Sequence, residues 1–151
     1  MAIDRADWHH GGDFPSGLPD ENGGTHIGMY LAWVINNQLE GEIHHEDEDS
    51  EQLLAQVRNR EITGRDFLFQ ACDEKFWESN LNAEGLAFTQ QYYVTTGSGP
   101  TYFEDYIAAL AEELPSIYHV EDTWENYDIL SKRLDQRFRG WKAERSKSIN
   151  N

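Results

Sequence analysis

The residues that could do chemistry in this chain are mainly histidines and carboxylates that lie close together in the sequence. His9 and His10 precede Asp13 in the segment WHHGGDFP, and His26 follows shortly after. Imidazole and carboxylate groups transfer protons and bind divalent metals. A metal site needs ligands that converge in space, however, and adjacent histidines on a loop usually point to different sides. The HExxH pattern, which places two histidines on one helical face, is absent.

A second group of chemically active side chains is the acidic run 40–51, which holds seven carboxylates, His44 and His45 but no Lys or Arg. Asp47, Asp49 and Glu51 have the alternate spacing of a calcium loop. No glycine follows them, and no glutamate stands at the final ligand position. The run therefore indicates either a solvated loop or an acidic docking edge for a basic partner, rather than a calcium site.

The sequence gives little support for nucleophilic catalysis, a phosphate-binding loop or a reactive cysteine. No GxSxG elbow occurs, and the glycine pairs at 11–12 and 23–24 do not lead into GK[ST]. Cys72 lies in an apolar helical stripe, where a free cysteine acts as a small hydrophobic residue. We expect no catalysis, no cofactor and no metal. The alternative that stays open is a small enzyme whose acid/base or metal site uses His9, His10, Asp13 and His26.

Composition and charge limit the class of protein. The chain has 151 residues with 28 acidic against 12 basic side chains, and its formal net charge of -16 disfavours nucleic acid as a partner. An aromatic content of 13% indicates a folded core. Residues 121–151 hold 6 acidic and 7 basic side chains, so the acidity lies in the first 120 residues. Neither a signal-peptide pattern nor an apolar run of about 20 residues occurs, which predicts a cytoplasmic protein without a membrane span.

The elements that must position these residues are predicted to be helices. We expect an all-α fold of about six helices in one compact domain over 1–151, with an ordered irregular Gly/Pro-rich arm at 1–24, a helical body at 25–145 and a frayed tail at 146–151. Short extended pieces are conceivable at EITGRDF and QQYYVTT. The expected helix starts are at caps Thr25, Ser50, Thr63 with Asp66, Asn82 and Asp122 with Glu125, and one further helix is expected to carry Pro100 in its first turn.

Gly28 lies inside the first expected helix. Glycine in a helix interior costs roughly 1 kcal/mol relative to alanine, so its presence suggests that another segment approaches closely. The irregular arm just upstream is the segment we expect there.

Four segments carry a family resemblance: DWHHGGDFPSGLP at 7–19, THIGMYLAWVI at 25–35, ITGRDFLFQACDEKF at 62–76 and LPSIYHVEDTWENYD at 114–128. Together they resemble a family of small acidic bacterial proteins with a W-H-x-G-G-D-F-P arm followed by T-H-I-G-M-[YF]-L-A-W. The resemblance runs from Asp7 to about Lys142. Members are similar to immunity proteins encoded beside polymorphic toxins or type VI secretion effectors, and the resemblance implies no catalytic residue.

The expected function is therefore that of a cytoplasmic immunity protein, which neutralises a cognate toxin by covering a basic surface, such as the cleft of a nuclease. A non-enzymatic adaptor is a further alternative, and homodimerisation through leftover aromatic surface stays open. The candidate toxin-binding residues are the loop carboxylates Glu42, Glu46, Asp47, Glu48 and Asp49, with Asp13, Asp20 and Glu21 from the arm as a second patch.

Overall fold

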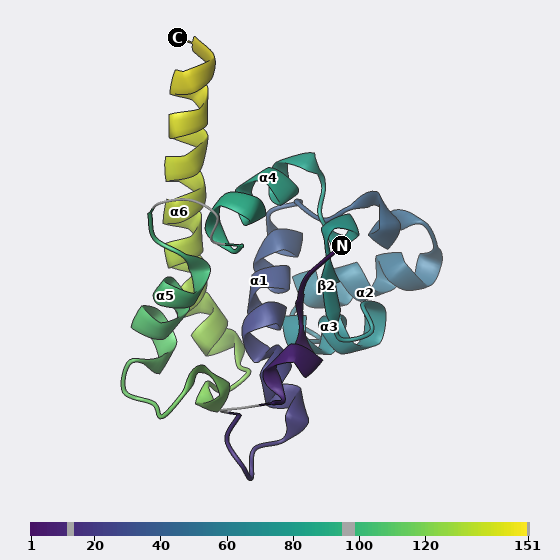
Figure 1. Ribbon diagram of the computed structural model, residues 1–151. Helices are drawn as coiled ribbons and strands as arrows, with labels where there is room; N and C mark the ends of the chain where they lie inside the picture. Colours follow the sequence, from purple (N-terminus) through teal and green to yellow (C-terminus); the bar gives the residue numbers. More distant parts are fainter. Residues whose placement is uncertain (12–13, 95–98, 151) are drawn as a thin grey trace.

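The protein is described by a computed structural model that covers residues 1–11, 14–94 and 99–150, without the side chains of 148–150. Its helical content confirms the predicted all-α fold (Figure 1). The α-helices in these ranges are α1 (Thr25–Asn36), α2 (Glu48–Arg58), α3 (Gly64–Ala71), α4 (Ala83–Tyr92), α5 (Tyr102–Tyr106) and α6 (Trp124–Asn150). The 3₁₀ segments are η1 (Ala6–His9), η2 (Asp20–Gly24), η3 (Glu42–His45), η4 (Glu78–Asn80) and η6 (Ile117–His119), and η5 (Ile107–Ala111) is a π-helical turn.

Helix α1 forms the centre of the core. Every residue from Thr25 to Ile35 is buried, since α1 packs against α2, α3 and α6 and against the arm at η2. Its aromatic side chains extend the core, because Trp33 contacts the rings of Phe88 and Phe138. The helix begins at Thr25 itself, after Gly24, so the prediction that Thr25 is a cap is wrong.

Helices α1 and α3 approach each other closely at two glycines. A Cβ atom built on Gly28 would lie 2.7 Å from the carbonyl carbon of Gly64 and closer still to the backbone of Arg65. The predicted close approach at Gly28 is therefore confirmed. The approaching segment is α3, however, and not the N-terminal arm. The first turn of α3 can press against α1 because neither glycine has a side chain at the contact.

The arm contributes a strand to the fold. Strand β1 (Ala2–Arg5) pairs antiparallel with β2 (Lys75–Trp77), and Ala6 continues the pairing by donating its backbone N–H to the Glu74 carbonyl. The extended pieces expected at EITGRDF and QQYYVTT are wrong for the described residues, since α3 begins at Gly64 and α4 continues to Tyr92. Strands of three and four residues are too short for an alternating pattern to stand out in a sequence.

Helix starts follow the predicted caps in two cases. The Thr63 hydroxyl accepts from the Asp66 backbone N–H, and the Asp66 carboxylate accepts from Thr63 in return. Asn82 caps α4 through the backbone N–H of Gly85. These two predictions are therefore confirmed. Both caps form because a short polar side chain stands directly before the apolar stripe of the helix.

Two other predicted caps are wrong. Asp47 caps α2 by accepting from the Ser50 backbone N–H at 2.7 Å, so the helix starts earlier than a Ser50 cap implies. Thr123, rather than Asp122, accepts from Asn126 at the start of α6. Asp122 instead accepts a hydrogen bond from Thr63 and lies 3.3 Å from Arg65, so a tertiary contact holds this carboxylate.

The arginines of α6 neutralise a buried carboxylate on α5. Asp105 accepts from Arg137 at 2.8 and 3.0 Å, from Arg133 at 3.1 Å and from the Tyr92 hydroxyl at 2.6 Å. Burial raises the pKa of Asp105, but the hydrogen bonds from Arg137 and Tyr92 and the arginine charges outweigh it, so the net pKa is lowered. The basic last helix is thus tied to the acidic body. No helix within the described residues is long and apolar enough to cross a membrane.

Arg137→Met is expected to lower the free energy of unfolding by about 2 kcal/mol, because Asp105 stays buried with fewer positive partners. Urea titration followed by circular dichroism measures the loss. Arg139→Met is the matched control, since Arg139 is exposed on the same helix and should cost less than about 0.5 kcal/mol. Equal losses in the two variants would contradict a specific role for the Asp105 contact.

Candidate functional site

Five carboxylates of the acidic run project into solvent from η3 and the start of α2, and we call this surface the acidic edge. Its members are Glu42, Glu46, Asp47, Glu48 and Asp49, and all five are exposed. Asp47 also accepts the α2 capping bond described above, which lowers its pKa and keeps it ionised. None of the five forms an ion pair with a Lys, Arg or His of the described chain segments. Their charge is therefore not offset by an ion pair within the described residues.

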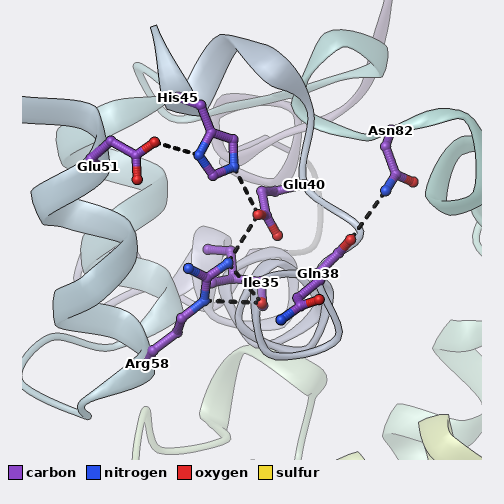
Figure 2. Close-up of polar contacts among 7 residues, drawn as sticks. All are labelled: Ile35, Gln38, Glu40, His45, Glu51, Arg58 and Asn82. Atoms are coloured by element: carbon purple, nitrogen blue, oxygen red, sulfur yellow. Dashed lines mark hydrogen bonds and ion pairs between the residues drawn. The ribbon is translucent and has the colours of Figure 1, made fainter. Parts of the chain in front are cut away.

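The base of the acidic edge is held by an ion-pair network centred on Glu40 (Figure 2). The Glu40 side chain is 6% exposed, and its Oε2 atom lies 2.9 Å from both Arg58 Nη2 and His45 Nε2. The other ring nitrogen of His45 lies 2.5 Å from a Glu51 carboxylate oxygen. Arg58 also donates to the Ile35 carbonyl, at 3.5 Å, which ties α2 to the end of α1.

This network favours a protonated His45. Hydrogen bonds to Glu51 and then Glu40 raise the pKa of His45, because the imidazolium form donates to both carboxylates at once. Glu40 Oε1 is buried and has no hydrogen-bond partner among the described protein atoms. Two of the seven carboxylates in the run thus stabilise the loop, and the other five form the acidic edge.

The second predicted patch does not extend the acidic edge. Asp20 and Glu21 are exposed on η2, and Glu21 lies 3.8 Å from Arg65, which offsets its charge. Segment η2 directly precedes α1, whereas η3 follows the other end of α1, about 18 Å away along the 12-residue helix. Asp13, the third residue of the patch, lies outside the described residues.

A separate cluster forms where the arm meets α1, and we call it the His–Asp cluster. Asp4 of β1 lies 2.8 Å from His9 Nε2 of η1 and 3.2 Å from His26 Nε2 of α1. The Tyr93 hydroxyl donates to Asp4 at 2.6 Å, and the Tyr118 hydroxyl lies 2.8 Å from His9 Nδ1. Segments far apart in the sequence therefore converge on one buried carboxylate.

The electrostatics of the His–Asp cluster keep Asp4 ionised. Burial raises the pKa of Asp4, but hydrogen bonds and charge attraction from His26 and His9 outweigh burial and hold it well below its usual range. Burial lowers the pKa of His26, and Asp4 only partly opposes this. Burial thus disfavours the charged form of the His26 ring, although the ring lies beside a carboxylate. Such a group can accept protons, orient a ligand or bind a cation.

Sequence reasoning found part of this cluster. His9 and His26 come together as the alternative enzyme hypothesis requires, but His10 points away and bonds to the Asp20 carbonyl at 2.9 Å. The carboxylate of the cluster is Asp4, which the sequence reasoning missed. Its only signal in the sequence is a charged residue directly after the short apolar segment MAI, and the pairing of β1 with β2 brings it to the histidines.

The geometry defines an all-α domain with an exposed acidic edge and a buried His–Asp cluster. The chain belongs to the family described as domain of unknown function DUF7832, whose model matches residues 2–120. The matched span includes both sites and ends before α6. No curated protein and no solved structure matches the chain.

Proposed function

We propose that this protein is an immunity protein that acts in the cytoplasm and neutralises a cognate bacterial toxin by covering a basic surface with its acidic edge. The observation that carries the proposal is the exposure of Glu42 and of 46–49 without a cationic partner inside the described chain. The resemblance to proteins encoded beside type VI secretion effectors supports the same role.

The mechanism requires no chemistry on the immunity protein. Clustered carboxylates attract a basic cleft over a long range and raise the association rate. A toxin that cleaves nucleic acid carries such a cleft, because it binds phosphates. The Arg58–Glu40–His45 network holds the loop, so little conformational entropy is lost when the acidic edge binds. Occlusion of the cleft would then exclude the substrate of the toxin.

Reversal of charge on the acidic edge tests the proposal. The triple variant Glu46→Lys, Glu48→Lys and Asp49→Lys should weaken binding to the toxin by at least about 100-fold, since even one or two close interfacial charge pairs, at about 1.5–7 kcal/mol each, account for such a loss. Asp47 is left in place because it caps α2. Binding is measured by titration calorimetry, and protection by growth during co-expression with the neighbouring toxin gene.

The matched control reverses three exposed carboxylates elsewhere, in the variant Glu104→Lys, Glu112→Lys and Glu113→Lys. Both triple variants have the same net charge, so only the location of the acidic side chains differs. The control should bind and protect nearly as well as the wild type. If wild-type protein gives no protection against the neighbouring toxin, the immunity role is wrong and an adaptor role gains support. If both triple variants protect equally, another surface binds the toxin.

A further inference from the structure

The His–Asp cluster has the composition and spacing of a metal site. Asp4, His9 and His26 each offer one ligand atom, and these atoms all lie within 4.8 Å of one another. Metal–nitrogen and metal–oxygen bonds of about 2.1 Å place the ligand atoms of a tetrahedral site about 3.4 Å apart. In the structure, His9 Nε2 lies 2.8 Å from Asp4 Oδ1, and His26 Nε2 lies 3.2 Å from the other oxygen, Oδ2.

We propose that Asp4, His9 and His26 bind a divalent transition-metal ion, such as Zn²⁺ or Fe²⁺, through both Nε2 atoms and one carboxylate oxygen. Two imidazoles and one carboxylate form a ligand set that suits these metals, whereas Ca²⁺ and Mg²⁺ prefer oxygen ligands. The site is separate from the acidic edge, and this inference does not depend on toxin neutralisation.

Two tyrosines support the ligands from behind. Tyr118 bonds to His9 Nδ1, the ring nitrogen that would face away from the ion, and so fixes the ring orientation. Tyr93 donates to Asp4 Oδ2, which leaves Oδ1 as the oxygen for the ion beside His9. Partners of this kind orient the ligands of metal sites and raise their affinity.

The charge of the cluster also favours a cation. Asp4 is 5% exposed, and its ion-pair partners among the described residues are His9 and His26. A buried carboxylate without a permanent positive partner is costly, and a divalent ion would supply the missing charge.

A pocket of about 280 Å³ gives access to the site. It borders Asp4 and His9, and its remaining lining consists of Ile3, Tyr93, Val94 and Phe103. An ion with three protein ligands keeps a coordination position for water or another small ligand. The pocket provides room for that fourth ligand next to Asp4 and His9.

The test uses the full chain without an affinity tag, freed of metal by a chelator and dialysed. Titration with Zn²⁺ by calorimetry should give one ion per chain, and Co²⁺ should give the intense visible absorption of a tetrahedral site. His9→Ala and Asp4→Asn should each weaken Zn²⁺ binding by at least about tenfold, since even changes behind the ligands cost about 10- to 100-fold. His10→Ala is the matched control and should bind as the wild type does.

Circular dichroism first establishes that each variant is folded. If Asp4→Asn fails to fold, the comparison of wild type, His9→Ala and His10→Ala decides the question, because His9 is partly exposed. The proposal is overturned if the wild type takes up no ion. It is equally overturned if His9→Ala keeps full affinity while His45→Ala loses it, because the ion would then belong to the Glu40–His45–Glu51 network.

Discussion

Gly64→Ala is expected to lower the free energy of unfolding by at least about 3 kcal/mol, which is the upper end of the usual cost of overpacking. The added Cβ would lie 2.6 Å from the Gly28 carbonyl carbon and closer still to its oxygen. Both atoms are backbone, so no side-chain rotation can relieve the clash, and α3 must move away from α1. That movement would loosen the packing of Phe67 and Leu68 against the central helix.

Urea denaturation followed by tryptophan fluorescence and circular dichroism measures this change. Gly28→Ala should have a similar effect, because its Cβ meets the same contact from the other side. Gly140→Ala is the control: this glycine lies in α6, and a Cβ added to it would have no heavy atom within 4 Å. Alanine at this position should therefore be neutral or stabilise by up to about 1 kcal/mol. Wild-type stability of Gly64→Ala would show that the two helices are not in close contact.

Asp4→Ala is expected to lower the free energy of unfolding by about 3–5 kcal/mol near pH 7 in the presence of a chelator. This is the usual effect of removing one partner from a buried ion pair. The Tyr93 hydroxyl and the His26 ring would lose their shared acceptor while they remain buried. Asp7→Ala is the control, because Asp7 is exposed and its ion-pair partner among the described residues is Arg5, at the surface. That change should cost less than about 1 kcal/mol.

Two groups of the His–Asp cluster, His26 and Asp4, also predict how the stability depends on pH. The pKa of His26 is lowered in the folded state, so the unfolded chain binds a proton first and wild-type stability falls as the pH drops below about 6.5. The pKa of Asp4 is lowered too. Its contribution to the free energy of unfolding is therefore complete above about pH 4 and is lost as the pH falls further. The stability difference between wild type and Asp4→Ala should therefore narrow below about pH 4. A difference that stays constant down to about pH 3 would contradict an ionised Asp4.

The acidic edge and the His–Asp cluster lie on different parts of the molecule and make different demands on it. The acidic edge consists of carboxylates without an ion-pair partner among the described residues. Glu40 and Glu51 of the same run instead form ion pairs that stabilise the loop. The cluster uses residues that the fold buries. Variants of one site are therefore expected to leave the other intact, which allows the binding and metal experiments to be interpreted separately.

The sequence by itself determined the helical class, several helix starts and the location of the acidic run. These features are local: an apolar stripe, a cap such as Thr63 or Asn82 and a cluster of charges are all encoded within a few residues. The close approach at Gly28 was also predictable, because glycine within a helix needs a packing reason. The sequence did not predict which segment approaches Gly28, because the contact in α3, at Gly64, lies some 36 residues downstream.

Only the tertiary structure decided which polar residues meet. Strand β1 brings Asp4 to two histidines, and α6 brings Arg137 to Asp105, through pairings that no local pattern records. It also decided which carboxylates of the acidic run are free, because a buried Glu40 and an exposed Glu46 look alike in the sequence. Charge and helix propensity are properties of short segments. Burial and ligand geometry depend on contacts between distant ones, and these arise only when the chain packs.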